Sequence, residues 1–211
     1  MKGVLATDLI EVSSDPDSLN EGGFWAVSTT FEGKYLFAKF ATVIRGESFP
    51  ESGEWNGLSE VWQSSMLQPD FEDYVNNIRE QIKLGNVYQV NACRILSTKI
   101  SKEISLAPLF SKILDKNPAP FASFLRLPDI EIASASPELF LAREGSHIKT
   151  SPIKGTRKLS ETGAAFSDKD RAENVMIVDL MRNDFGRICK VGSVKVSQLF
   201  RSELHPGLEH L

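Results

Sequence analysis

The sequence predicts an α+β fold in which antiparallel sheets are flanked by single helices. Most of the predicted strands come in pairs that a short polar connection joins, as in β-hairpins. Only three segments show the apolar spacing of a helix, and they do not alternate regularly with strands as helices do in a parallel sheet. Apolar residues make up 41% of the 211 residues, and a chain of this length can bury a sizeable core.

The strand predictions rest on runs of β-branched and aromatic residues that lie between turn-forming residues. The Gly, Pro, Ser and Glu content of Gly46–Asn56 predicts a loop. The first 20 residues carry only a weak pattern, with a turn at 13–19. The predicted strands are Phe24–Thr30, Tyr35–Ile44, Val87–Leu96, Phe121–Leu127, Ile130–Ala135, Leu139–Arg143, His147–Thr150 and Ser193–Val196.

The clearest helix is predicted at Phe71–Leu84, where apolar side chains recur at helical spacing. Asp70 is a suitable N-cap residue before it, and Gly85 is a common stop signal after it. The same signals predict two further helices, at Ala107–Asp115 and at about Asp170–Asp184, the second with Gly186 as its stop.

The charge balance and the cysteine content narrow the class of protein. A formal net charge of -4 and a pI of about 5.5 argue against a nucleic-acid binder, which usually has a basic face. No window approaches the roughly 18 apolar residues that a spanning helix needs, and the first ten residues resemble neither a signal peptide nor an anchor. Cys93 and Cys189 lie far apart without metal-binding spacing. We therefore expect a cytoplasmic protein with reduced, buried thiols.

The segment Ser151–Arg157 (SPIKGTR) combines two cations with residues that give the backbone unusual angles. Successive N–H groups around Gly155 and Thr156 could bind an anion. Lys154 and Arg157 would bring positive charge to the same place. The segment could equally be a polar turn after a strand, since exposed lysines are common.

The segment Lys169–Asp184 (KDRAENVMIVDLMRND) places a carboxylate on an apolar helix stripe. Glu173 shares a helix face with apolar residues such as Met176 and Ile177. A carboxylate there is costly unless it meets a cation or hydrogen-bond donors. A hard cation such as Mg²⁺ would accept its oxygen as a ligand. A salt bridge to Lys169 or Arg171 is the simpler alternative.

Glu138 follows Pro137 and precedes an apolar strand. A carboxylic acid at the end of a strand could act as a general acid. It could equally cap a turn, and the sequence alone does not separate these two interpretations.

Taken together, these motifs resemble the chorismate-binding enzyme family, which includes anthranilate, aminodeoxychorismate, isochorismate and salicylate synthases. The resemblance runs from about Phe71 to Leu211, and the long run within residues 167–189 is its most specific part. It implies an anthranilate synthase component I-like fold. The segments that carry it are VYQVN at 87–91, SASPELF at 134–140, TSPIKGTR at 150–157, SDKDRAENVMIVDLMRNDFGRIC at 167–189 and GSVKV at 192–196.

Two positions favour the aminodeoxychorismate synthase component I branch of this family. Lys154 stands in the motif where that branch typically has Lys and anthranilate synthases typically have Ala. Gln89 stands where isochorismate and salicylate synthases typically have a Lys that acts as a base. The resemblance therefore implies conversion of chorismate and ammonia to 4-amino-4-deoxychorismate, for para-aminobenzoate and folate synthesis.

The resemblance also implies roles for individual residues. Lys154 matches the amine that attacks C2 of chorismate, and Glu138 matches the acid that protonates the departing 4-hydroxyl. Glu173 matches a carboxylate that holds Mg²⁺, the expected cofactor, which polarises the ring as a Lewis acid. The remaining positions implied to bind substrate are the backbone N–H groups of Gly155 and Thr156, and the side chains of Gln89 and His210.

The resemblance implies that the ammonia comes from a separate glutamine amidotransferase subunit. No glutaminase-type nucleophile motif is visible in the chain. We expect 1–211 to form a single partial domain, β-rich at 1–69, motif-bearing at 70–211 and incomplete at the C-terminus. In the family, a Gly-Ala-Pro-Lys segment and a second metal-binding Glu follow, so the chain is expected to be weakly active or inactive. The alternatives are an anthranilate synthase component I with an atypical Lys, and a non-catalytic remnant that binds a partner.

Overall fold

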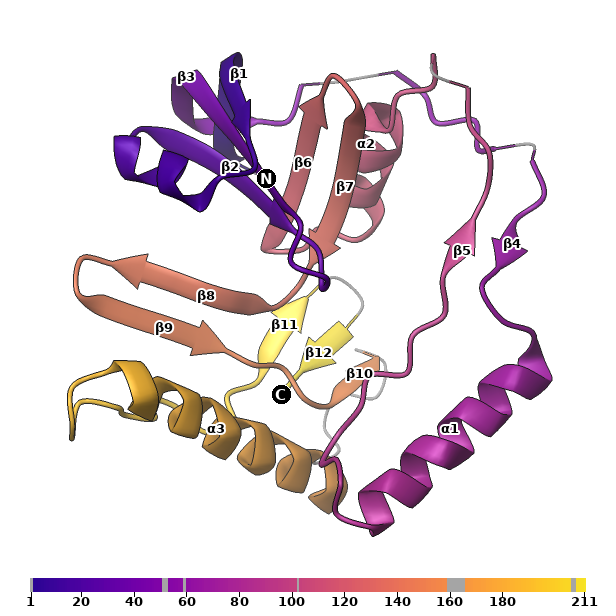
Figure 1. Cartoon of the computed structure of the whole chain (residues 1–211), viewed down its shortest axis with the longest axis vertical. Helices are drawn as coiled ribbons and strands as arrows, with labels where there is room; N and C mark the ends of the chain where they lie inside the picture. The colour runs from indigo at the N-terminus through magenta and orange to yellow at the C-terminus, as the bar shows by residue number, and fades with distance from the viewer. Residues whose placement is uncertain (1, 51–52, 59, 102, 159–165, 206–207) are drawn as a thin grey trace. The chain divides into compact units, whose positions relative to one another are not determined.

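The computed structural model describes residues 2–211 except 51–52, 59, 102, 159–165 and 206–207 (Figure 1). The chain divides into two compact units, one made of Met1–Glu54 with Leu106–Leu211 and the other of Trp55–Ser105. The elements are β1 (Lys2–Ser13), the 3₁₀ helix η1 (Pro16–Glu21), β2 (Phe24–Thr29), β3 (Tyr35–Ser48), β4 (Gln63–Ser64), α1 (Gln68–Lys83), β5 (Leu96–Ser97), α2 (Ala107–Lys116), β6 (Phe121–Leu127), β7 (Ile130–Ser136), β8 (Leu139–Glu144), β9 (His147–Ser151), β10 (Thr156–Lys158), α3 (Asp168–Ile188), β11 (Glu203–His205) and β12 (Leu208–His210).

Every strand pairing among the described residues is antiparallel. The first unit holds four of the sheets, namely β1–β3–β2, β6–β7, β8–β9 and β10–β12–β11, together with α2 and α3. The predicted α+β class with antiparallel sheets and flanking helices is confirmed. The hairpins predicted at 121–135 and 139–150 are present within one residue of their expected ends.

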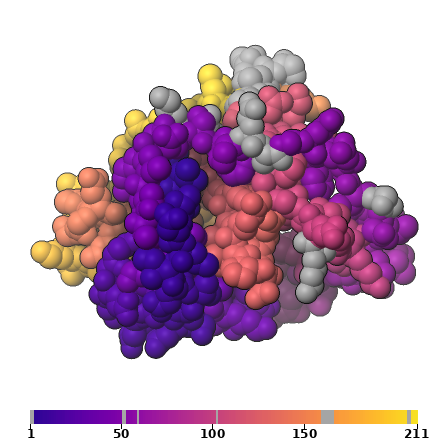
Figure 2. Space-filling view, turned by 90° about the horizontal axis from the view of Figure 1, so that it is seen from above, coloured from indigo at the N-terminus to yellow at the C-terminus, as the bar shows by residue number. Residues whose placement is uncertain are grey.

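The first sheet departs from the sequence prediction in two ways. Strand β1 was not expected, and its side chains are exposed or partly buried on both faces, so no alternating pattern marks it. Strand β3 continues to Ser48, through the start of the predicted Gly46–Asn56 loop. Gly46 has φ +83 and lies where the register shifts between β1 and β3, so it forms a bulge instead of ending the strand. Figure 2 shows the exterior of this sheet in indigo and purple.

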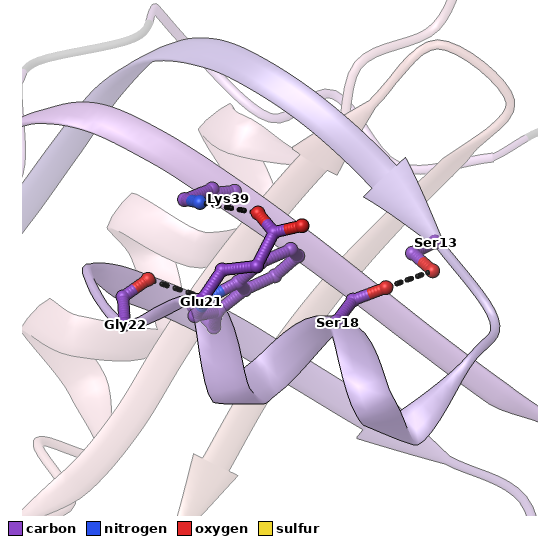
Figure 3. Close-up of polar contacts among 6 residues, drawn as sticks. Ser13, Ser18, Glu21, Gly22 and Lys39 are labelled. Atoms are coloured by element: carbon purple, nitrogen blue, oxygen red, sulfur yellow. Dashed lines mark hydrogen bonds and ion pairs between the residues drawn. The ribbon is translucent and has the colours of Figure 1, made fainter.

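Side-chain contacts attach η1 to the sheet (Figure 3). The Lys39 ammonium on β3 pairs with the Glu21 carboxylate at 2.9 Å. The same ammonium lies 5.2 Å from the ring centroid of Trp25 on β2. The Trp25 indole N–H donates to the backbone carbonyl of Gly22, at 3.0 Å. These contacts fix the connection between β1 and β2 against the central strand.

An aromatic cluster forms the core between α2 and the hairpin β6–β7. Phe110 on α2 is 4% exposed and packs edge-to-face on Phe49, with ring centroids 4.8 Å apart. Phe124 on β6 contacts both rings. The Glu131 carboxylate on β7 accepts a hydrogen bond from the N–H of Leu106, the residue before α2. Helix α2 is thereby held by apolar packing along its length and by a charged acceptor at its first turn.

Helix α3 and the strands after it also correct the prediction. The helix begins at Asp168 and continues to Ile188, past the expected stop at Gly186. A glycine stops a helix by taking a left-handed conformation, and Gly186 is not among the described glycines with positive φ. The predicted strand Ser193–Val196 has no strand conformation. Strands β10, β11 and β12 were not predicted, because three residues are too few to show a period.

The second unit contains α1 and the short pair β4–β5. Helix α1 begins two residues before Asp70, so Asp70 is the third residue of the helix and not the residue before it. Its carboxylate accepts a hydrogen bond from the backbone N–H of Leu67, at 3.3 Å. Gly85 ends the helix with φ +75, as predicted. The predicted strand Val87–Leu96 is wrong except at its last residue. Within the described part of this unit, only Leu96–Ser97 finds a partner strand, and an alternating sequence without a partner forms no ladder.

Both cysteines are free, and Cys93 is exposed instead of buried as expected. In the part of the chain that the structure describes, no helix combines the length and the apolar character needed to cross a membrane. The prediction of one domain over residues 1–211 stays a prediction.

The aromatic cluster predicts a clear stability difference. Phe110→Ala leaves a cavity beside Phe49 and Phe124 and is expected to lower the free energy of unfolding by about 3 kcal/mol. Phe31→Ala, at a fully exposed ring, is the matched control and should change it by less than about 0.5 kcal/mol. Urea unfolding followed by fluorescence measures both, and equal losses would contradict the assignment of Phe110 to the core.

Candidate active site

The pairing of β10 with β12 brings together four of the predicted site residues. Thr156 lies opposite His210 in the antiparallel register. The N–H of Lys154 donates to the carbonyl of Leu211 at 2.8 Å, and the N–H of Leu211 donates to the carbonyl of Gly155 at 3.1 Å. The backbone around Lys154 is therefore fixed by the residues that directly follow β12.

Gly155 lies where no other residue fits without strain. Its φ is +80, and a Cβ atom there would lie 3.1 Å from Cβ of Asp170 and 3.2 Å from Cδ1 of Phe166. Side chains rarely adopt such a φ, and contacts this short require a neighbour to move. The glycine thus lets the Lys154 loop approach the first turn of α3 closely.

The first turn of α3 is closed by its own side chains. Ser167 is the N-cap, and its hydroxyl accepts the N–H of Asp170 at 3.1 Å. The Asp170 carboxylate accepts the hydroxyl of Ser167 at 2.6 Å and the N–H of Ser167 at 3.1 Å. The hydrogen bond from the Ser167 hydroxyl is the main cause that lowers the pKa of Asp170. A reciprocal cap of this kind fixes where the helix begins, beside Gly155.

Glu173 lies one turn further along α3 and is 41% exposed. Its carboxylate is 3.6 Å from the Lys169 ammonium, so the simpler alternative, an ion pair with Lys169, is present. The next residue, Asn174, is buried, and its amide donates to the Leu211 carbonyl at 3.5 Å. Leu211 therefore connects the helix that carries Glu173 to the loop that carries Lys154.

Among the described residues, no group of three or more His, Cys, Asp or Glu side chains gathers in a way that could hold a metal ion. Glu173 offers one hard oxygen ligand, which suits Mg²⁺ chemically but does not make a complete site by itself.

Arg157 points its charge at Glu209 instead of sharing an anion site with Lys154. Its guanidinium contacts the Glu209 carboxylate through Nε at 2.8 Å and Nη2 at 2.6 Å. The same guanidinium lies 4.2 Å from the ring centroid of Phe166. The hydroxyl of Ser202 also donates to Glu209, and this bond, followed by Arg157, lowers the pKa of the carboxyl. Glu209 therefore compensates part of the positive charge that Arg157 was expected to bring to the place of Lys154.

His210 is 7% exposed, and its Nδ1 lies 2.8 Å from the Thr156 hydroxyl. Its ring meets that of His205 edge-to-face, with centroids 4.9 Å apart. Burial is the main cause that lowers the pKa of His210, and the charge of His205 adds to it. Both effects favour the neutral imidazole.

Glu138 lies before β8, and its exposed side chain has no hydrogen bond or ion pair among the described residues. Leu139 pairs with Ser151, so Glu138 and Lys154 both lie beyond the same end of the hairpin β8–β9. Gln89 belongs to the second unit and lies outside any strand, contrary to the predicted strand there. The substrate and metal roles of all these residues stay predictions.

Sequence reasoning missed several residues that shape the site. Ser167 and Asp170 match the spacing of a capping box, so this pair could have been found from the sequence. Glu209 and His205 carry no such signal, because their partners are distant in the sequence or lie on strands of three residues.

Residues 26–211 match the model of the chorismate binding enzyme family. The chain is 42% identical over 163 residues to aminodeoxychorismate synthase component 1 of Salmonella typhimurium, covering 73% of this chain and 36% of that protein. It is 35% identical over 162 residues to anthranilate synthase component 1 1 of Haloarcula marismortui, covering 72% and 32%. The chain thus spans about a third of the length of these curated relatives.

A solved structure has the same fold. Anthranilate synthase component I from Streptococcus pneumoniae TIGR4 superposes with a TM-score of 0.63 at 20% sequence identity. The match covers 99% of this chain and 56% of that one. At this identity the likeness shows the fold alone, and it confirms the predicted anthranilate synthase component I-like architecture.

The geometry at Gly155 predicts the effect of adding one methyl group. Gly155→Ala should lower the free energy of unfolding by about 2 kcal/mol, since it meets a strained φ and the side chain of Asp170. Gly145→Ala is the matched control, because Gly145 has φ +58 and open space around it. The control should lose only about 1 kcal/mol for its backbone conformation. Thermal or urea unfolding of both variants measures the difference, and a smaller loss at Gly155 would refute the close contact.

The Arg157–Glu209 ion pair predicts a pH-dependent loss of stability in acid. The pKa of Glu209 is lower in the folded chain than its usual 4.5. Its contribution is therefore present above pH 4.5 and is lost as the pH falls through the lowered pKa. Glu209→Gln should destabilise the protein at neutral pH, and the difference from the parent should shrink in acid.

Denaturant unfolding across this pH range, with Glu47→Gln on β3 as an exposed control, measures this difference. A gap between Glu209→Gln and the parent that is independent of pH would argue against the ion pair.

Proposed function

The chain belongs to the chorismate binding enzyme family, and from that premise we propose that the protein acts as component I of an aminodeoxychorismate synthase. The reaction would convert chorismate and ammonia to 4-amino-4-deoxychorismate, which leads to para-aminobenzoate and folate. Relatives with that name, in Salmonella typhimurium and in Escherichia coli, are 42% and 40% identical to the chain. Because the chain spans about a third of their length, the proposal concerns the activity of the whole protein.

Lys154 is the observation that carries the proposal. Its motif resembles that of aminodeoxychorismate synthases, in which a Lys stands at this position. The hydrogen bond of its N–H to Leu211, and the bond from Leu211 to Gly155, fix the backbone on both sides of its side chain. A nucleophile needs such fixed placement, since orientation of the reacting atoms supplies much of the rate enhancement.

The proposed chemistry has two balanced steps. The Lys154 amine, in its neutral form, attacks C2, both conjugated ring double bonds shift, and the bond from C4 to the hydroxyl oxygen breaks. Glu138 gives its proton to that oxygen, because hydroxide is a poor leaving group. Ammonia then attacks C4, both double bonds shift back, and the bond between C2 and the lysine nitrogen breaks. The added nitrogen returns its surplus proton to Glu138. The net products are 4-amino-4-deoxychorismate and water.

Substrate binding is assigned to groups near Lys154. The N–H groups of Gly155 and Thr156 would bind a substrate carboxylate, and His210, opposite Thr156, would contact the substrate from β12. The resemblance alone supports Gln89 as a further substrate residue of the proposal.

Mg²⁺ is proposed as the cofactor, with Glu173 as one of its oxygen ligands. When bound, Mg²⁺ would polarise the ring carboxylate as a Lewis acid. No full set of ligands gathers among the described residues, so the proposal names Glu173 alone.

A glutamine amidotransferase subunit is the proposed source of ammonia. The name component 1, carried by the relatives, refers to one part of a two-part synthase. Reaction with a soluble small molecule and with ammonia from a partner fits the predicted location in the cytoplasm.

Anthranilate synthase component I is the second candidate function. Relatives with this name in Haloarcula marismortui and Aquifex aeolicus are 35% and 33% identical to the chain. A non-catalytic protein that binds a partner is the third, and exposed apolar side chains such as Phe140 and Ile10 would suit it. Lys154 favours the first function over both, since neither alternative has a use for an amine there.

The proposal predicts that activity depends on Lys154 and not on its neighbouring lysine. The purified protein, given chorismate, Mg²⁺ and an ammonium salt, should form 4-amino-4-deoxychorismate, followed by liquid chromatography with mass detection. Lys154→Met should lower the rate at least about a thousandfold, because it removes the nucleophile. Lys158→Met, at an exposed position on β10, is the matched control and should keep the rate. Anthranilate as the product would establish the second candidate instead.

A further inference from the structure

His205 has no role in the proposed reaction, yet it lies against His210 in the small sheet β10–β12–β11. Glu203 pairs with His210 in the register, and His205 lies two residues further along β11. Alternate residues of a strand share a face, so Glu203, His205 and His210 lie on the same side of the sheet. Thr156 pairs with His210 from β10 and belongs to that side as well.

The contact with Thr156 indicates where His210 carries its ring proton. A hydroxyl has one hydrogen to donate, and Nδ1 of a neutral histidine can accept it. Among the described residues, Thr156 has no other acceptor for its hydroxyl hydrogen. Donation from Oγ1 to Nδ1, across 2.8 Å, therefore satisfies both atoms and leaves the proton of the ring on Nε2.

The surroundings of His205 indicate that it competes with His210 for a proton. Its side chain is 12% exposed, and its buried Nε2 has no hydrogen-bond partner in the described part of the chain. That nitrogen lies 4.0 Å from the Glu203 carboxylate, too far for a hydrogen bond but close enough for attraction of a charged ring. Two imidazolium rings in edge-to-face contact repel each other, so the pair takes up its protons one at a time.

Glu203 acts on both rings, because its charge also raises the pKa of His210. The Nε atom of Arg201 lies 3.7 Å from the other carboxylate oxygen of Glu203, so Arg201 compensates part of the negative charge of Glu203. Arg157 and Glu209 occupy the alternate positions of β10 and β12, on the opposite side of the sheet, and compensate each other. Thr156, the residue of β10 opposite His210, is uncharged.

We propose that His205 is a positioning residue for His210: the charge that its ring can carry, in edge-to-face contact with His210, opposes the charging of His210. Together with Thr156 it holds the His210 proton on Nε2. His210 then offers a ligand a neutral N–H donor instead of a positive charge. This inference rests on the proposed function only for the identity of that ligand, chorismate.

Nitrogen-15 NMR of the histidine side chains in the ligand-free protein tests the proposal. The chain has three histidines, and His147, exposed on β9, serves as an internal reference. At neutral pH, Nδ1 of His210 should give the shift of an unprotonated ring nitrogen and Nε2 that of a protonated one. On acidification, His210 should become protonated at a lower pH than an unperturbed histidine, because burial and the charge of His205 lower its pKa.

Substitutions separate the proposed coupling from a merely structural role. His205→Phe keeps an aromatic ring but removes the competing proton site, so His210 should take up its proton at a pH higher by about one unit. Thr156→Val should abolish the tautomer preference of His210, whereas Thr156→Ser should retain it. His147→Phe is the control and should leave the His210 curve unchanged. If His205→Phe does not fold, His205→Gln replaces it and should likewise raise the pH at which His210 takes up its proton.

A protonated Nδ1 on neutral His210, or a His210 curve that neither His205→Phe nor His205→Gln moves, would overturn the proposal. Binding of chorismate, measured by calorimetry near pH 8 and again near the pH at which His210 becomes protonated, separates this inference from the proposed function. A protein that binds no chorismate but shows the expected NMR behaviour would refute the proposed function and leave the role of His205 intact.

Discussion

The backbone hydrogen bonds between Leu211 and the segment Lys154–Gly155 are the contacts on which the candidate site depends. They join the end of β12 to the start of β10. These strands are distant in the sequence, since Thr156 on β10 and His210 on β12 are 54 residues apart. The Leu211 carbonyl also accepts the amide of Asn174, so the first half of α3 is attached to the same point. The loop, the helix and the histidine hairpin are positioned by one backbone junction, and local distortion there would move all three.

Charge is distributed unevenly around that junction. Arg157 is compensated by Glu209, and Glu173 is compensated in part by Lys169. Among the described residues Lys154 has no ion pair, and it lies beside the strained glycine that lets its loop approach α3. An amine without an ion-pair partner among the described residues, held by a rigid backbone, suits the nucleophilic role that is proposed for Lys154. The Ser167–Asp170 cap contributes to this arrangement, because the Asp170 carboxylate is satisfied by Ser167 at the helix end and does not compensate the Lys154 amine.

The family assignment and the geometry support each other at different levels. The family model covers residues 26–211, and the relatives divide between aminodeoxychorismate and anthranilate synthases. Similarity over most of the chain therefore identifies the family, while the proposal for the branch rests on the side chain at position 154. The two-histidine arrangement on β11 and β12 is a separate feature, because it concerns the protonation of His210 and would act on any ligand that contacts that ring.

The sequence by itself determined the α+β class, the hairpins at 121–135 and 139–150 and the motif that contains Lys154, because each is encoded by residues close together in the chain. It placed Val87–Leu96 and Ser193–Val196 in strands wrongly, since an alternating pattern becomes a strand only if a partner forms a ladder with it. The tertiary structure alone decided that Gly46 forms a bulge, that Arg157 pairs with Glu209 and that His210 meets Thr156 and His205. These outcomes depend on contacts between distant segments, and the identity and spacing of neighbouring residues do not determine such contacts.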